Sequence, residues 1–222
     1  MEHRLLGFFS GFPSRHFPHN IAGRLCEELT RRSSMVFVSA WPAEHAETDR
    51  DAAIMYACFE EIGLPFAQYY VIDNRMEPSR AARLIQEASC VHLMGGHPGL
   101  QIKFLRGTGL DTAICNSPAV LLGVSAGAIN MGKRSLDTKE SLTPYKGLGL
   151  ADITVKPHFE PKKRKVLKTL LRISEDLPIC AMEDDSAIFV AGDCVSSMGE
   201  IHWIHRGKIC PLREGGPLCH VE

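Results

Sequence analysis

The stretch AVLLGVSAGAINM, residues 119–131, carries the strongest structural signal in the chain. Its first part, Ala119–Val124, is a continuous apolar run typical of a strand buried on both faces. Its second part, Ser125–Met131, predicts a short helix. Between them, Gly123-Val-Ser-Ala-Gly127 matches G-x-S-x-G, a sharp strand-to-helix turn that needs small residues beside the serine. The stretch therefore predicts an α/β fold in which Ser125 is exposed at the carboxyl edge of a sheet.

Outward from this stretch, apolar runs alternate with amphipathic ones, as in a mostly parallel central sheet flanked by helices on both faces. Further strands are predicted at Leu5–Phe9, Met35–Ser39, Ala67–Ile72, Cys90–Met94 and Ile153–Lys156. Further helices are predicted at Asn20–Arg32, Asp49–Ile62 (with Thr48 as N-cap and Gly63 at the end), Pro78–Ala88, Leu100–Leu105, Thr112–Asn116 and Lys162–Ser174. The last third predicts a short antiparallel extension with strands Ile179–Met182, Ala187–Val190, Ile201–His205 and Lys208–Pro211. With no internal repeat or linker, residues 1–222 are expected to form a single domain.

Composition narrows the class of protein. Of 222 residues, 45% are hydrophobic and 23% charged, which are globular averages and exclude disordered, collagenous and coiled-coil chains. The formal net charge of −1 gives no reason to expect nucleic acid or an anionic membrane as partner. No apolar run approaches the roughly 20 residues that span a bilayer, and the amino-terminal run is too short for a secretory signal. We therefore expect a cytoplasmic protein whose eight cysteines, none in a C-x-x-C pair, are reduced and mostly buried.

Ser125 needs a base, because a serine hydroxyl is a weak nucleophile by itself. Among ten histidines, His158 stands at the end of the predicted strand Ile153–Lys156, which would bring it to the same edge of the sheet as Ser125. The helix beginning at Ala126 would present unpaired N–H groups and a partial positive charge to an oxyanion. Two simpler roles stay open: Ser125 as a helix N-cap and His158 as a strand-end histidine bonded to backbone.

The third member of such a triad is a carboxylate that orients the imidazole. Glu183 and Asp184 lie in a turn between two predicted strands, and Asp137 is a less specific candidate. Gly95-Gly96, after the strand Cys90–Met94, would let backbone N–H groups approach a substrate carbonyl. The loop that contains these glycines has neither the Lys-Ser/Thr pair of a P-loop nor the three-glycine spacing of a dinucleotide site, so we do not expect it to bind phosphate.

The other histidines carry weaker signals. His97 follows the glycine pair closely enough to touch substrate. His92 lies inside a strand and is expected to be a core residue whose ring is hydrogen bonded. His202 and His205 fall on opposite faces of a strand with no further ligand nearby, so no metal site is expected there.

Three segments together resemble the peptidase E and cyanophycinase-like family of serine peptidases. They are Gly95-Gly96 after an apolar strand, Gly123-Val-Ser-Ala-Gly-Ala-Ile-Asn130, and Pro157-His158-Phe159, with the acidic turn before Ala187–Val190 as a weaker fourth. The resemblance implies a class I glutamine amidotransferase-like (flavodoxin-like) fold. It also implies hydrolysis of small peptides next to aspartate, without metal or organic cofactor.

Residue by residue, the resemblance implies Ser125 as nucleophile, His158 as general base, and Gly96 with Ala126 as donors to the oxyanion. Contacts with substrate are implied for Gly95, His97 and Asn130. The chain departs from the family pattern at the acid. The family often has a glutamate four residues before the apolar position that Ile188 occupies here, and in this chain that residue is Asp184, with Glu183 next to it. It also departs at the loop after the glycine pair, which reads His97-Pro98-Gly99.

Two other functions stay open on the sequence. An α/β-hydrolase esterase shares the serine turn but orders its triad Ser, acid, His, which would use Asp184 or Asp193 with His220. A binding domain without activity on the same fold is the second. The basic run 162–165 is expected to be a solvated helix face, or to attract an acidic substrate toward His158. The expected partner is a small peptide, and whether the chain forms a homodimer is left open.

Overall fold

The structure, a computed structural model, describes residues 4–139 and 142–212. Its main sheet has seven strands: β1 (Leu5–Phe9), β2 (Met35–Ala40), β3 (Tyr69–Ile72), β4 (Cys90–Gly96), β5 (Val120–Val124), β10 (Ala187–Ala191) and β11 (Cys194–Met198). They lie in the order β11-β10-β1-β5-β4-β2-β3. The pairs from β1 to β3 are parallel, whereas β10 and β11 add an antiparallel edge. The predicted mostly parallel α/β sheet is confirmed.

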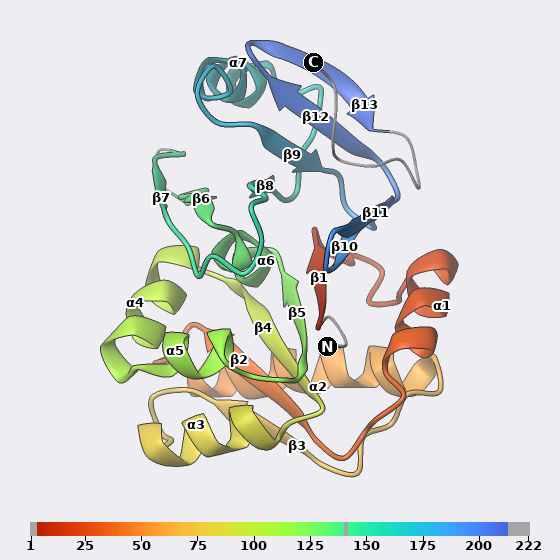
Figure 1. Cartoon of the computed structure of the whole chain (residues 1–222), viewed down its shortest axis with the longest axis vertical. Coiled ribbons are helices and arrows are strands. Elements are labelled where there is room, and N and C mark those ends of the chain that lie inside the picture. Colours follow the sequence, from red (N-terminus) through yellow and green to blue (C-terminus); the bar gives the residue numbers. More distant parts are fainter. Residues whose placement is uncertain (1–3, 140–141, 213–222) are drawn as a thin grey trace.

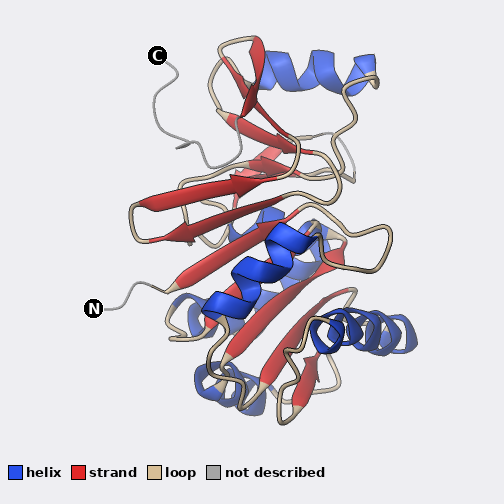
Figure 2. Cartoon of the chain, turned by 90° about the vertical axis from the view of Figure 1, so that its right-hand side faces the viewer, coloured by secondary structure: helices blue, strands red, loops and turns tan. Residues whose placement is uncertain are grey.

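Helices cover both faces of this sheet (Figures 1 and 2). One face packs against α1 (His19–Glu28) and α2 (His45–Glu61) through a core that includes Phe9, Phe37 and Phe59. The other face packs against α3 (Pro78–Glu87), α4 (Pro98–Thr108), α5 (Leu110–Cys115) and α6 (Ala126–Met131). Strands buried on both faces explain why their sequences read as continuous apolar runs.

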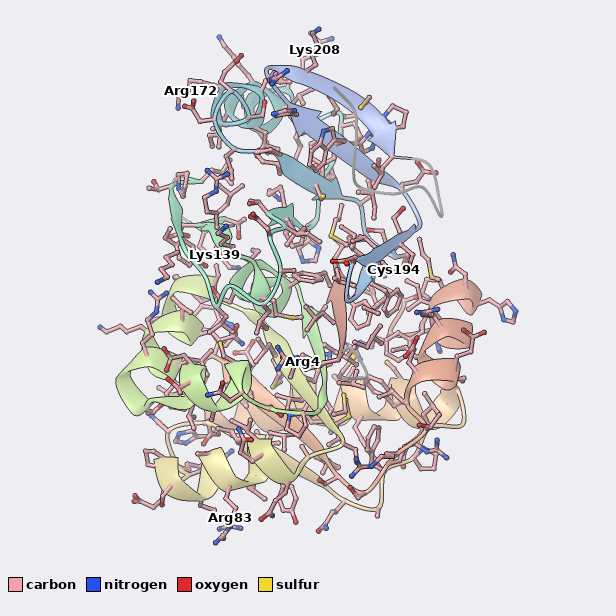
Figure 3. The ribbon with its side chains drawn as sticks, viewed as in Figure 1. Arg4, Arg83, Lys139, Arg172, Cys194 and Lys208 are labelled. Atoms are coloured by element: carbon pink, nitrogen blue, oxygen red, sulfur yellow. The ribbon has the colours of Figure 1, made fainter. Side chains whose placement is uncertain are left out.

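A smaller sheet lies beyond the carboxyl ends of the parallel strands (Figure 1). It has the order β13-β12-β9-β8, from β8 (Val155–Lys156), β9 (Ile179–Met182), β12 (Ile201–His205) and β13 (Lys208–Leu212). The helix α7 (Arg164–Ile173) covers it, and the labelled side chains of Arg172 and Lys208 point outward at this end of the molecule (Figure 3). A separate hairpin, β6 (Arg134–Leu136) and β7 (Pro144–Lys146), follows α6. The sequence predicted the antiparallel extension but not that it would form a second sheet.

Several element ends differ from the prediction. The helix α2 begins at His45, so Thr48 is not its N-cap but a buried residue of the first turn, hydrogen bonded at 2.9 Å to Ser39. Gly63 follows the helix with φ +78°, as expected of a residue that ends one. The first helix stops at Glu28 rather than Arg32.

Two properties of the whole chain were also predicted. None of the helices within residues 4–139 and 142–212 is long and apolar enough to cross a membrane. The seven cysteines in these ranges are free thiols, as predicted, but only three of them are buried and two are exposed, so the prediction that the cysteines are mostly buried is wrong. Cys219 lies outside the described residues.

Candidate active site

Ser125 occupies the turn between β5 and α6 in a strained backbone conformation, with φ 50° and ψ −107°. A non-glycine residue adopts this region only when its surroundings force it. Here the close packing of α6 onto β4 and β5 imposes this backbone conformation on Ser125. A side chain at Gly127 would overlap the Leu93 carbonyl, and a Cβ at Gly123 would lie 2.7 Å from the Ala128 nitrogen. The small residues of the G-x-S-x-G turn are therefore required by this close contact.

His158 and Asp184 form a hydrogen-bonded chain with Ser125. The Nε2 atom of His158 lies 3.0 Å from Ser125 Oγ, and its Nδ1 atom lies 2.6 Å from Asp184 Oδ1. Because an ionised carboxylate only accepts, Nδ1–H donates to Asp184 and Nε2 is left to accept the Ser125 hydroxyl proton. This is the order of contacts by which a histidine activates a serine.

The three side chains come from the ends of different strands. Ser125 follows β5 of the main sheet, His158 follows β8 shortly after that strand ends, and Asp184 follows β9. His158 also has a positive φ of 51°, and its backbone N–H donates to the buried Ser10 hydroxyl at 2.8 Å. The Ser10 hydroxyl in turn donates to the Met182 carbonyl at 3.0 Å, which ties β1, β8 and β9 together at this point.

Gly11 packs so closely against the imidazole of His158 that it leaves no room for a side chain. A Cβ at this position would lie 2.5 Å from His158 Cε1 and 3.0 Å from Asp184 Oδ1. Only glycine therefore allows the chain after β1 to pass this close to the histidine and its acid. Neither Ser10 nor Gly11 could be predicted from the sequence, since a Ser-Gly pair after a strand is common and carries no distinctive local signal.

Of the three acids left open by the sequence, Asp184 is the one that contacts His158. The Glu183 carboxylate turns the other way and lies 2.8 Å from His202 Nε2. Asp137 lies after β6, where its carboxylate accepts from the Lys139 N–H at 3.0 Å. The expectation that Glu183 or Asp137 serves as the orienting acid is therefore not supported by the geometry.

A cavity of about 400 Å³ opens in front of Ser125 and His158. Gly95 and Gly96 form one wall, and a Cβ on Gly95 would lie 3.6 Å from Ser125 Cβ. Gly96 has φ +139°, and a side chain there would overlap the Trp41 ring, so this position also requires glycine. The N–H of Ala126, in the first turn of α6, has no partner within its own helix. A carbonyl held in this cavity would therefore meet backbone donors.

Comparison with known proteins now bears on this geometry. The sequence model of peptidase family S51 matches residues 25–198, which is more than half of the chain and includes Ser125, His158 and Asp184. The chain belongs to peptidase family S51. It is accordingly a serine peptidase, and the predicted resemblance to peptidase E is confirmed. The esterase alternative is not supported, and its histidine, His220, lies outside the described residues.

Two solved structures resemble the S51 chain in fold. A peptidase from an acI-B1 Actinobacterium has a TM-score of 0.76 and 18% identity, and the match covers 97% of this chain and 96% of that one. A putative peptidase E protein from Listeria monocytogenes EGD-e has a TM-score of 0.67 and 19% identity, covering 88% of this chain and 98% of that one. At these identities the likeness shows the fold alone. A search of the curated proteins found no match.

The cavity of this S51 peptidase carries two lysines on its walls, Lys139 and Lys156. Lys139 lies beyond β6 (Figure 3), and Lys156 ends β8 beside His158, where its ammonium donates to the Pro157 carbonyl. Burial lowers the pKa of Lys156 to about 8, and the nearby Lys163 adds to the effect. The sequence had pointed only to the run 162–165, so the two lysines on the cavity wall are a finding of the structure.

Two predicted contacts with substrate do not match the structure of the S51 chain. His97 caps α4, with Nδ1 accepting from the Leu100 N–H at 3.4 Å, and Asn130 is fully buried; both lie outside the described lining of the cavity. The Asn130 amide donates to Pro98 and Gln101 and accepts from the Tyr145 hydroxyl, so it holds α4 and β7 against α6.

His92 is a core residue, as predicted, but its ring is not hydrogen bonded. Only 1% of it is exposed, and neither ring nitrogen has a partner among the described residues. The ring packs between Phe37 and Phe59. Burial in these apolar surroundings lowers the pKa of His92 to about 4, so the imidazole is neutral near pH 7.

Proposed function

We propose that this S51 peptidase hydrolyses small peptides next to an acidic residue, with Ser125 as nucleophile, His158 as general base and Asp184 as the acid that orients the base. The observation that carries the proposal is the continuous chain of contacts, 3.0 Å from Ser125 to His158 and 2.6 Å from His158 to Asp184, behind a strained serine. Such a chain is needed to activate a serine hydroxyl near neutral pH.

In the proposed mechanism, Ser125 Oγ attacks the scissile carbonyl carbon while its proton moves to His158 Nε2. Asp184 accepts from Nδ1–H throughout, which fixes the tautomer and stabilises the imidazolium. The C–N bond then breaks, and His158 gives its proton to the leaving amine. Water, deprotonated by His158, hydrolyses the resulting ester on Ser125 and regenerates the hydroxyl.

The negative charge that develops on the carbonyl oxygen needs donors that are already in place. We assign this role to the backbone N–H groups of Gly96 and Ala126. Gly96 lines the cavity, and Ala126 begins the helix behind the nucleophile, where unpaired N–H groups and the helix dipole favour an anion. Every group in this mechanism is a side chain or backbone group of the chain itself.

The acidic substrate is proposed from the charges of the cavity. Lys139 and Lys156 lie on its walls, and Lys156 is held beside His158 by its contact with Pro157. The whole chain has a net charge of only −1, so its overall field does not attract anions. Selection for a carboxylate would come from these local cations, which act over a few ångströms at physiological ionic strength.

The test combines covalent labelling with hydrolysis of a matched pair of dipeptides. A fluorophosphonate should label Ser125, and the enzyme should cleave Asp-Leu in preference to its neutral isostere Asn-Leu. His158→Ala should lower kcat/KM roughly 10⁴-fold, whereas His205→Ala, at the end of β12 and outside the cavity lining, should match the wild type. A folded protein that is neither labelled nor active would contradict the triad. Equal rates for the two peptides would contradict the acidic preference alone.

A further inference from the structure

A second cavity, of about 230 Å³, adjoins the nucleophile on the other side of the main sheet. Its inner wall is formed by Met94 and Val124, of which only 6% and 9% are exposed, and Met55 of α2 forms the outer wall. The first cavity, by contrast, includes Ile129 of α6. The two cavities therefore lie on opposite faces of the sheet, one on the face that packs against α6 and one on the face that packs against α2.

Gly95 is shared by both cavities and lies between them. Its missing Cβ would lie 3.6 Å from both Ser125 Cβ and Val124 Cγ1, so the boundary between the two cavities lies directly beside the nucleophile. A peptide whose scissile carbonyl rests at Ser125 would therefore have one cavity on each side of that bond.

Successive side chains of an extended peptide point to opposite sides. If the residue on one side of the scissile bond enters the lysine-lined cavity, its neighbour across the bond points toward the α2 face. We propose that the second cavity is a specificity pocket for an apolar side chain on this neighbouring residue, so that the substrates are peptides joining an acidic to an apolar residue. This inference rests on the proposed function.

The lining of the pocket supports an apolar occupant. The walls named above are aliphatic or thioether groups, and His92 beside them is buried and neutral, with pKa about 4. The charged residues Arg15 and Asp51 also line the cavity, but both are exposed and they are of opposite sign. A volume of about 230 Å³ holds several water molecules at roughly 30 Å³ each, and their release by an aliphatic side chain is favourable.

The first experiment compares four dipeptides with the wild-type enzyme: Asp-Leu, Asp-Gly, Leu-Asp and Gly-Asp. Whichever residue order the enzyme cleaves, Asp first or Asp second, the peptide that contains leucine should have a kcat/KM at least ~10-fold above that of the peptide with glycine in its place. This is the discrimination typical of a buried aliphatic group. If both peptides are hydrolysed and the ratio of their kcat/KM values, leucine over glycine, is near one, the second cavity is not a specificity pocket, and the proposed function is unaffected. Absence of hydrolysis of all four peptides would contradict the proposed function itself.

The second experiment fills the pocket. Met55→Trp, at a half-buried position of α2, should reduce the leucine-to-glycine ratio to about one. The matched control is Arg50→Trp, five residues earlier on the same helix, where 64% of the side chain is exposed and the ratio should keep its wild-type value. A Met55→Trp protein that is folded, is labelled at Ser125 and keeps the wild-type ratio would place the leucine side chain elsewhere and refute the inference.

Discussion

Substituting Gly11 by alanine tests whether the fit behind His158 controls catalysis. The added Cβ would lie 2.5 Å from His158 Cε1, whereas ordinary carbon contacts begin at about 3.4 Å. The imidazole would therefore have to retreat by roughly 0.9 Å. Because 51% of its side chain is exposed, it can swing toward solvent without disturbing the core. The expected effect is on catalysis far more than on stability.

The size of the effect follows from the hydrogen bond that the retreat breaks. The distance from His158 Nε2 to Ser125 Oγ, 3.0 Å in the native protein, would lengthen toward 3.9 Å, which is no longer a hydrogen bond. A misplacement of about 1 Å costs on the order of 10²-fold in rate, and complete loss of the base costs more. We therefore expect kcat to fall by about 10²-fold while KM changes less, since His158 is the only residue of the cavity lining that is displaced.

The assay measures kcat and KM on an Asp dipeptide, together with the rate of fluorophosphonate labelling and the thermal midpoint. Gly23→Ala is the matched control, because this glycine lies within α1 with no atom near its missing Cβ. It should stabilise the protein by about 0.5–1 kcal/mol and leave hydrolysis unchanged. A folded Gly11→Ala enzyme with kcat within about threefold of the wild type would refute the reasoning, since the histidine would then tolerate the displacement.

Asp184→Asn should lower kcat by roughly 10⁴-fold through the wrong histidine tautomer, whereas Glu183→Gln should change it by less than about tenfold; equal losses would contradict the assignment. Since Lys156 has a pKa of about 8 and is cationic only below it, kcat/KM for an Asp peptide should fall as pH rises through 8. In Lys156→Met this decline should be absent, and a profile identical to that of the wild type would exclude Lys156 from substrate binding. Asn130→Ala should lower the free energy of unfolding in urea by about 2–4 kcal/mol, because it leaves buried partners unpaired, and a loss below about 1 kcal/mol would show that water replaces the amide.

The serine turn could be read from the sequence because the close contacts that it makes require small residues at fixed positions around Ser125. The crossing of α6 over β4 and β5 leaves no room for side chains at Gly123 and Gly127, so the spacing of glycines around Ser125 reports the contact directly. The alternation of buried strands and amphipathic helices is likewise a property of neighbouring residues, which is why the parallel sheet was predicted.

The orienting acid could not be read in this way. Glu183 and Asp184 are adjacent residues of the segment that joins β9 to β10, and Asp184 lies in a turn there, so no periodicity fixes where either side chain points. Which of them faces His158 therefore depends on how β9 is set in the smaller sheet, whose pairing with β12 places His202 beside Glu183. No local pattern contains that information.

The chain alone therefore indicated Ser125, His158 and the parallel sheet, because small residues at a turn and the ends of apolar runs leave a direct mark on composition and spacing. Only folding brought Ser10 and Gly11 against His158, across a separation of 148 residues between Ser10 and the histidine. The same holds for Asn130, a polar residue whose partners on α4 and β7 are set by packing. Contacts between distant segments depend on how whole sheets and helices meet, and any one segment is compatible with many such arrangements.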